Sequence, residues 1–278
     1  MSIYSWYEAW TPGQFPTILG IGDSWFWYPK ENNLMDGLAR NNALKLDYRN
    51  MVRVGQNGAV LADYVDVPGR PGQFSKQLQT LIAPDNVKTF SAVLVSGAGN
   101  DALDYSLGLN NDCSGAASAD DCISQVGMGQ LLKSVGQSVG LLLNEVIWAF
   151  TEAGQSPHIF LNTYDYAVPD GRGFDIGPAI TVSGPWLKKA MDDRRVPNDM
   201  GLRKQVVHIL IDRLAAIFNQ YQSDQNGIYV IDIRGTLSSD PATYQNDWDN
   251  ELHPTSAGFD KIINQHWIPA FQRLGLAN

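Results

Sequence analysis

Ser24 and His253 are the two residues of this sequence whose types and settings suit nucleophilic catalysis. Ser24 follows an apolar run that carries Gly20 and Gly22, where a strand would turn sharply into a helix. A serine at such a turn is exposed at the end of a sheet, and its backbone N–H can stabilise an oxyanion. The pair Asp23-Ser24 is also an ordinary helix N-cap, so this motif alone favours neither interpretation.

His253 has the setting of a general base. It precedes a proline at the start of the last predicted helix, and carboxylates surround it in Asp249-Asn250-Glu251-Leu252-His253-Pro254. A lone loop histidine is also commonly structural. The remaining histidines occupy a strand start or helix interiors, where packing or surface roles are expected: His158, His208 and His266.

Two further loops carry groups that could stabilise an oxyanion. Gly58 follows the second predicted strand, where its N–H could face a carbonyl, although a plain turn is the simpler explanation for a single glycine. Asn100 follows the third strand and could direct its amide into the same crevice, with Asp101 bracing the loop. Gly97-Ala98-Gly99 and Ala102 also match G-x-G-x-x-A, so a nucleotide- or dinucleotide-binding protein is the rival interpretation. That fingerprint normally follows a first strand, and here it follows the third.

The predicted elements place these loops at one edge of a sheet. Apolar, β-branched runs bounded by turn residues predict five buried parallel strands, at residues 17–21, 46–54, 92–96, 158–162 and 228–233. Helical periodicity predicts helices around residues 131–150, 202–221 and 256–274. Strands that alternate with helices predict a three-layer α/β/α fold, and the lack of repeats or linker-like composition predicts one domain over residues 1–278.

Two long segments interrupt this pattern, at about residues 103–127 and 164–200. Loops of this length in a compact domain are commonly functional lids or disordered. Because both follow the carboxyl ends of strands, we expect them on the rim of the crevice. There Trp186 and the aromatic run Trp25-Phe26-Trp27-Tyr28 would shape a substrate site. Inward packing of two of those four rings is the plainer expectation, but neighbouring helical positions face different ways, so at least one ring should reach the crevice.

Taken together, the four loops resemble the SGNH (GDSL-type) hydrolases. The matching blocks occur in the family's order over roughly residues 17–260: Gly22-Asp23-Ser24, Gly58, Gly99-Asn100-Asp101 and His253-Pro254. The resemblance implies a flavodoxin-like fold and a serine esterase, of lipase or carbohydrate-ester deacetylase type, with Ser24 as nucleophile and His253 as base. It also implies an oxyanion hole made by the N–H groups of Ser24 and Gly58 and the side-chain amide of Asn100.

The sequence departs from the family pattern at three places. An aromatic run follows Ser24, and Ala98 stands where the third block usually begins with glycine. The triad acid is normally an aspartate three residues before the histidine, and that position holds Asn250. A neutral asparagine can orient an imidazole but stabilises an imidazolium less, so Asp249 is the alternative partner. The missing acid also leaves open a catalytically inactive SGNH-like binding module. The residues around His253 resemble a bacterial branch of the family.

Charge and hydropathy exclude several kinds of partner. The chain has 278 residues with 20 basic and 29 acidic side chains, a net charge of −9, and no basic cluster larger than Arg194-Arg195. Binding to a nucleic-acid backbone needs such clusters, so no nucleic-acid partner is expected. No apolar run approaches the ~18 residues of a membrane span. A small-molecule, carbohydrate or lipid ester is the expected partner, and the oligomeric state is left open.

The two cysteines, Cys113 and Cys122, cannot supply the four ligands in paired spacings that a zinc site needs. They form either a disulfide or two free thiols. The H-E-x-x-H, P-loop and EF-hand patterns do not occur in the sequence, so neither a metal ion nor a cofactor is expected. No signal peptide is visible, which predicts a cytoplasmic protein. A secreted or periplasmic protein is the alternative if the chain is trimmed and the cysteines are bonded.

Overall fold

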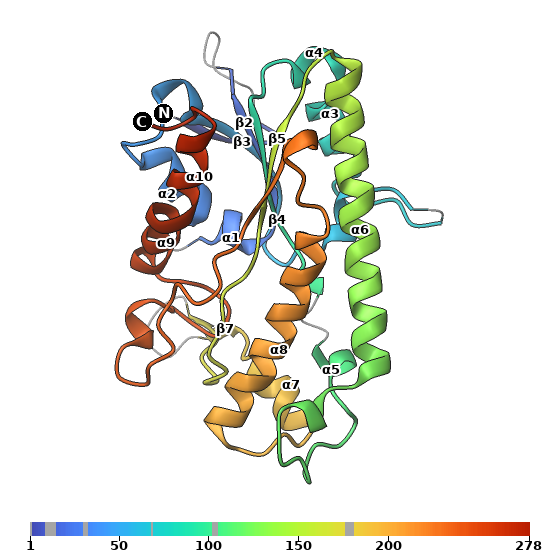
Figure 1. Ribbon diagram of the computed structural model, residues 1–278, viewed down its shortest axis with the longest axis vertical. Helices are drawn as coiled ribbons and strands as arrows, with labels where there is room; N and C mark the ends of the chain where they lie inside the picture. Colours follow the sequence, from blue (N-terminus) through green and yellow to red (C-terminus); the bar gives the residue numbers. More distant parts are fainter. Residues whose placement is uncertain (1, 9–14, 30–32, 68, 102–104, 176–180) are drawn as a thin grey trace.

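A six-stranded parallel sheet forms the centre of the protein in the computed structural model, which describes residues 2–8, 15–29, 33–67, 69–101, 105–175 and 181–278 (Figure 1). The strand order is β1-β3-β2-β4-β5-β8, and every neighbouring pair is parallel. The strands are β1 (Ser2–Ser5), β2 (Ile18–Gly22), β3 (Asn50–Gly55), β4 (Ala92–Ser96), β5 (His158–Asn162) and β8 (Ile228–Ile231). The predicted α/β class and parallel sheet are confirmed.

The strand β1 is an addition to the five that the sequence predicts. It is a four-residue edge strand that pairs only with β3, and half of its residues are incompletely buried. Such a strand needs no continuous apolar run, so the hydropathy pattern carries no signal for it. The second predicted strand is shorter than expected, because Leu46–Tyr48 form a 3-10 turn before β3 begins.

Helices cover both faces of the sheet, which gives the three layers expected. In Figure 1, α2, α9 and α10 lie on one side, and α3, α4 and α6 lie on the other, with α8 packed beside α6. The helices are α1 (Ser24–Trp27), α2 (Leu34–Arg40), α3 (Ser75–Leu81), α4 (Pro84–Val87), α5 (Tyr105–Gly108), α6 (Gln125–Glu152), α7 (Leu187–Asp193), α8 (Met200–Asn219), α9 (Ser256–Ile262) and α10 (Ile268–Arg273). A π turn at Ile263–Trp267 interrupts the last predicted helix just before Pro269, which has no N–H to donate. None of the described helices is long and apolar enough to cross a membrane.

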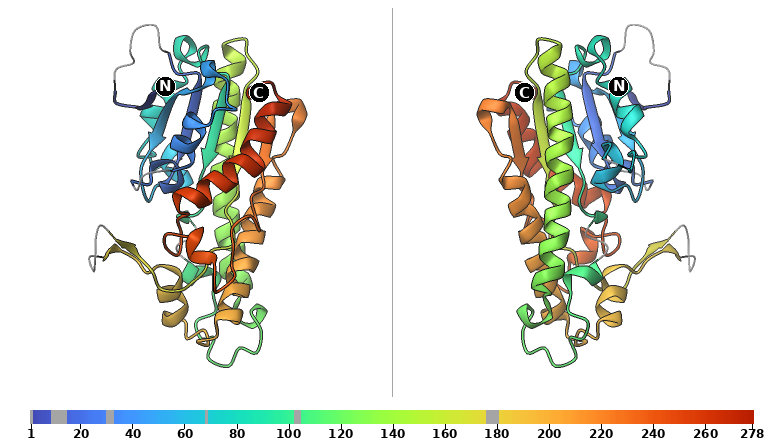
Figure 2. Two further views of the ribbon diagram at one scale, coloured as in Figure 1. Left: turned by 90° about the vertical axis from the view of Figure 1, so that its left-hand side faces the viewer. Right: turned by 90° about the vertical axis from the view of Figure 1, so that its right-hand side faces the viewer.

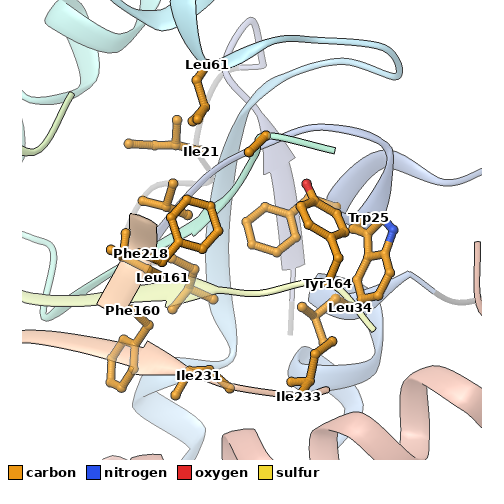
Figure 3. Packing of buried hydrophobic residues seen from close by; sticks show 14 of the residues in the cluster. Ile21, Trp25, Leu34, Leu61, Phe160, Leu161, Tyr164, Phe218, Ile231 and Ile233 are labelled. Carbon is orange, nitrogen blue, oxygen red and sulfur yellow. The ribbon is translucent and has the colours of Figure 1, made fainter. Parts of the chain in front are cut away.

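The core fills both spaces between the sheet and the helix layers. Every residue of β2 and of β4 is buried, which explains why their sequences are continuously apolar and do not alternate. Figure 3 shows part of this core, where Trp25 lies beside Tyr164 and where Phe160, Leu161 and Ile231 pack from neighbouring strands.

The carboxyl ends of the central strands are level with one another. Gly22 at the end of β2 is paired with Gly55 of β3 and with Ser96 of β4, and Ser96 is paired with Asn162 of β5. The loops that follow these strands therefore leave the sheet at the same edge. Gly55 allows this close approach, because it has φ +124° and a Cβ there would lie 2.2 Å from the carbonyl oxygen of Gly22.

The two long segments lie beyond this edge, as their positions after β4 and β5 predict (Figures 1 and 2). The first contains α5, a 3-10 turn at Asp120–Cys122 and the start of α6. The second is more regular than the sequence suggests, since it contains α7 and a hairpin of β6 (Phe174–Asp175) and β7 (Thr181–Ser183) that projects from the body in Figure 2. Residues 102–104 and 176–180, which include Ala102, lie outside the described part of the chain.

Cys113 and Cys122 are free, buried thiols, so the disulfide alternative is not formed. The Cys113 thiol lies 3.7 Å from the carbonyl oxygen of Cys122, and burial is the main reason that the pKa of Cys122 is raised to about 12.

Candidate active site

Ser24 and His253 meet at the carboxyl edge of the sheet, although 229 positions separate them in the sequence. Asp23 caps α1, where its carboxylate accepts the N–H of Trp25 at 3.0 Å, and Ser24 is the first residue of the helix. The Ser24 hydroxyl lies 2.7 Å from Nε2 of His253. The N-cap and nucleophile interpretations of Asp23-Ser24 are therefore compatible, because Asp23 supplies the cap and leaves the Ser24 hydroxyl to the imidazole.

Asn250, three residues before His253, holds the other side of the imidazole. Its Oδ1 lies 3.0 Å from Nδ1 of His253 and also accepts the backbone N–H groups of Leu252 and His253 at 3.0 Å each. These two backbone donors orient the amide so that its oxygen faces the ring. Nδ1 of the neutral imidazole then carries the proton, and Nε2 is left as the acceptor for the Ser24 hydroxyl.

Asp249, the alternative partner, is joined to this group through Tyr28. The Tyr28 hydroxyl donates to the Asp249 carboxylate and accepts the Asn250 amide N–H at 2.9 Å. The Tyr28 ring also stacks on His253, with 4.2 Å between ring centroids and 14° between the planes. Of the two candidates for the third position, Asn250 is the one whose side chain bonds Nδ1.

The two loops with candidate oxyanion donors are tied to each other. The Asn100 amide donates to the carbonyl oxygen of Ala59 at 3.0 Å, and the Asp101 carboxylate accepts the N–H of Leu61 at 3.0 Å. An amide nitrogen has two N–H groups, so Asn100 keeps a second one for the cleft. Gly58 has φ +82° and is exposed. The expected bracing role of Asp101 agrees with this geometry, and burial raises its pKa to about 6.

Asp23, next to Ser24 in the sequence, lies in a buried polar cluster. Besides the N–H of Trp25, its carboxylate accepts the hydroxyls of Ser96 and Tyr164. The residue is 2% exposed, and burial raises its pKa to about 6, against the opposing effect of these three donors.

The glycines of the dinucleotide-like segment serve packing. A Cβ on Gly97 would lie 2.5 Å from the Leu61 side chain, and a Cβ on Gly99 would lie 2.9 Å from the Tyr164 ring. Protein side chains thus fill the space that a pyrophosphate needs beside such glycines. This geometry disfavours the nucleotide-binding interpretation.

A cleft of about 350 Å³ opens in front of the Ser24 hydroxyl. It is lined by Ser24, Tyr28, Pro29, Asn57, Gly58, Asn100, Phe174, Ser183, Trp186, Leu252 and His253. The Trp186 ring stands edge-on to the His253 ring, with centroids 5.9 Å apart, and Phe174 packs against Tyr28 in the same manner at 5.5 Å. The cleft thus combines Ser24, His253, Gly58 and Asn100 with an aromatic wall.

Trp25 occupies a different place from the one expected. It is only 3% exposed and lies beside Tyr164 (Figure 3). Its ring packs edge-to-face on Tyr164 and Phe259, and its indole N–H donates to the carbonyl oxygen of Leu252. It borders a hollow of only about 30 Å³ on the inner side of Ser24. The ring of the aromatic run that reaches the large cleft is that of Tyr28, because α1 ends at Trp27 and the chain changes direction there.

Glu251 joins the 164–200 segment to the loop of His253 through hydrogen bonds. Its buried carboxylate accepts four backbone N–H groups at 2.7–3.0 Å, from Gly171, Trp186, Leu187 and Lys188. Burial raises the pKa of Glu251, and these donors oppose that shift. The position of Trp186 against the imidazole depends on this contact, and no local sequence motif predicts it.

The other histidines lie elsewhere in the fold. His158 begins β5, His208 of α8 stacks on Tyr166, and His266 shares a hydrogen bond with the hydroxyl of Thr236. No group of three or more histidine, cysteine or acidic side chains suited to hold a metal ion occurs within the described ranges.

The fold of this chain is similar to that of a lipase of known structure. A lipase from a goat rumen metagenome superposes with a TM-score of 0.52 at 13% identity, over 95% of this chain and 99% of that chain. The chain has the fold of this lipase, a parallel sheet flanked by helices on both faces. Other structures similar to it include a family 3 carbohydrate esterase of Clostridium thermocellum, with a TM-score of 0.42, 14% identity and coverage of 98% and 99%. A protein described as a GDSL-like lipase, from Bacteroides ovatus, has a TM-score of 0.44, 11% identity and coverage of 95% and 55%. No protein-family model and no curated protein matches the sequence.

The parallel topology explains how four motifs far apart in the sequence lie together. Each motif follows a strand of the central sheet or precedes a helix, and all four lie at the same edge of the sheet. The first three follow β2, β3 and β4, and the fourth precedes α9.

Proposed function

We propose that the protein is a serine hydrolase that cleaves carboxylic esters through an acyl-enzyme on Ser24. The observation that carries this proposal is the continuous hydrogen-bonded arrangement of Ser24, His253 and Asn250, at 2.7 Å and 3.0 Å, beside a cleft that Ser24, His253, Gly58 and Asn100 line. A serine hydroxyl bonded to an oriented imidazole is the arrangement that nucleophilic catalysis requires.

In the first half-reaction, Ser24 Oγ bonds to the ester carbonyl carbon while its proton passes to Nε2 of His253. The carbonyl oxygen becomes an oxyanion, which the N–H groups of Ser24 and Gly58 and the free amide N–H of Asn100 stabilise. When the C–O bond to the alcohol breaks, the imidazolium returns the proton to the departing oxygen. In the second half-reaction, a water oxygen bonds to the acyl carbon while its proton passes to Nε2 of His253. The bond between the acyl group and Ser24 Oγ then breaks, the imidazolium returns the proton to Oγ, and the carboxylic acid is released.

The cleft suits an ester with a ring or an alkyl chain. Tyr28, Phe174 and Trp186 offer aromatic faces and edges, and Leu252 and Pro29 add apolar surface. Such a wall can pack on a sugar ring or on an acyl chain. The proposed substrates are therefore small-molecule, carbohydrate or lipid esters.

The proposal is tested by hydrolysis of p-nitrophenyl acetate and butyrate by the purified protein. We expect turnover that Ser24→Ala abolishes, whereas Ser114→Ala, the same change at an exposed serine, leaves it intact. A folded wild-type protein that hydrolyses neither these esters nor acetylated sugars would instead support an inactive SGNH-like binding module.

A further inference from the structure

The hydrogen-bonded chain at the active site does not end at Asn250. The Asn250 amide N–H donates to the Tyr28 hydroxyl at 2.9 Å, and the Tyr28 hydroxyl donates to the carboxylate of Asp249. From Ser24 through His253 onward, every group donates to the next in the same direction. The chain terminates on a full negative charge, which is the charge that the third position itself lacks.

The direction of this chain is set by the backbone. Oδ1 of Asn250 accepts the N–H groups of Leu252 and His253, so Nδ2 must face Tyr28 and the amide cannot be reversed without losing both bonds. The hydroxyl of Tyr28 keeps its proton, because burial and the Asp249 carboxylate raise the pKa of this phenol well above its ordinary value.

Burial makes such a chain effective. Asn250 is fully buried and Tyr28 is 5% exposed, so little water screens the charge of Asp249 along this path. Hydrogen bonds that point the same way polarise one another, which strengthens each of them. A carboxylate at the end of the chain therefore makes Oδ1 of Asn250 a stronger acceptor for the imidazole N–H.

We propose that Asp249, acting through Tyr28 and Asn250, supplies the negative charge that stabilises the imidazolium of His253. Tyr28 and Asp249 are positioning residues in this scheme, which rests on the proposed function. Every proton transfer of the reaction passes through Nε2 of His253, and the hydrogen bonds from Nδ1 to Asp249 shorten or lengthen without transferring a proton. The Tyr28 ring, stacked on the imidazole, adds a second favourable contact for the charged ring.

Other charged groups lie around the imidazole, and their effects on the pKa of His253 must be distinguished from the effect of Asp249. They are Asp23 beneath Ser24, Asp165 in the small hollow, Asp175 near Tyr28, Glu251 on the same loop, and Arg172, whose guanidinium donates to the carbonyl oxygens of Trp248 and Asp249. Because Asp23 and Asp101 have raised pKa values, a pH–rate profile alone would mix several titrations. The test therefore has to measure the protonation of the His253 imidazole directly.

The test measures the pKa of His253 by NMR in protein labelled with ¹⁵N-histidine, where four histidines give a simple spectrum. Asp249→Asn removes the charge but keeps an oxygen for the Tyr28 hydroxyl, and Tyr28→Phe removes the hydroxyl but keeps the stacked ring. We expect each change to lower the pKa of His253 by roughly one unit, because a nearby negative charge favours the imidazolium. The acid limb of kcat/KM for p-nitrophenyl acetate should move the same way. Asp85→Asn, an equal charge change on exposed α4, should leave both unchanged.

The double variant Asp249→Asn/Tyr28→Phe should shift the pKa no further than either single variant, since both act along one path. An unchanged pKa in Asp249→Asn, or fully additive shifts, would overturn the proposal. If Asp249→Asn does not fold, Tyr28→Phe alone provides the test. It should still lower the pKa of His253 by roughly one unit, because it breaks the path to the Asp249 carboxylate, and an unchanged pKa in this variant would overturn the proposal. These outcomes are separate from the proposed function, which fails only if Ser24 has no reactivity.

Discussion

Replacing Asp23 by asparagine should change how the stability of the protein depends on pH. The Asp23 carboxyl is 2% exposed, and burial raises its pKa from 3.8 to about 6 in the folded protein. A carboxyl with a raised folded pKa stabilises the fold fully below its unfolded pKa, and this contribution is lost as the pH rises through the folded pKa. The protein should therefore become less stable between about pH 4 and pH 7 because of this one group.

The magnitude follows from the shift. A difference of roughly two units, at 1.36 kcal/mol each, amounts to about 3 kcal/mol, of which about 2 kcal/mol falls between pH 4.5 and pH 7.5. Asparagine has a similar shape but does not titrate, and it loses some of the bonds from Trp25, Ser96 and Tyr164 at every pH. The constant loss cancels when the two proteins are compared across pH.

The assay is urea unfolding of wild type and Asp23→Asn at several pH values, followed by tryptophan fluorescence. The free energy of unfolding of Asp23→Asn, relative to wild type, should rise by about 2 kcal/mol from pH 4.5 to pH 7.5. A relative free energy that stays constant would show that the Asp23 pKa is not raised. One that falls would show that the three hydrogen-bond donors outweigh burial, and either result would refute the reasoning.

Two further predictions concern the loop after β4. Ala98 has φ +87° in a buried position, so Ala98→Gly should relieve backbone strain and stabilise the protein by about 1 kcal/mol, measured as a higher urea midpoint; a lower midpoint would argue against strain there. Asn100→Ala should lower kcat for p-nitrophenyl acetate by a factor of about 10²–10³ with little change in KM, because the lost donor stabilises the transition state. An unchanged kcat would show that Asn100 is not part of the proposed oxyanion hole.

The parts of the fold that the sequence predicts well are those fixed by local hydropathy. The strands β4 and β5 have the predicted bounds, because central parallel strands are buried on both faces and their sequences are continuously apolar. Local hydropathy does not predict the edge strand β1. Local periodicity does not predict α7 in the 164–200 segment either, because the start of this helix is held by the distant carboxylate of Glu251.

At the site, sequence motifs likewise predict some features, and others depend on tertiary contacts. Spacing along the chain placed Ser24, Gly58, Asn100 and His253 at one edge, since parallel strands end together. Spacing could not decide between Asn250 and Asp249, because a one-residue change in the loop exchanges which side chain faces the ring. The structure assigns Asn250 to the ring through hydrogen bonds from Leu252 and His253, and these depend on the folded loop.

The residues that line the cleft are the hardest to predict. Trp25 follows Ser24 directly and is buried, whereas Tyr28, three positions after Trp25, lines the cleft. Which ring faces outward depends on where the four-residue helix α1 ends, and helix ends are poorly marked in sequence.

The central claim is that Ser24 is an activated nucleophile, and covalent labelling with a fluorophosphonate tests it most directly. Reaction of the serine oxygen with the phosphorus centre, with loss of fluoride, needs the same imidazole base and oxyanion donors as ester cleavage. Intact-mass spectrometry should show one adduct per chain, and peptide mapping should place it on Ser24, with no adduct on the Ser24→Ala variant. An adduct on another serine, or an unmodified wild-type protein that is demonstrably folded, would contradict the account.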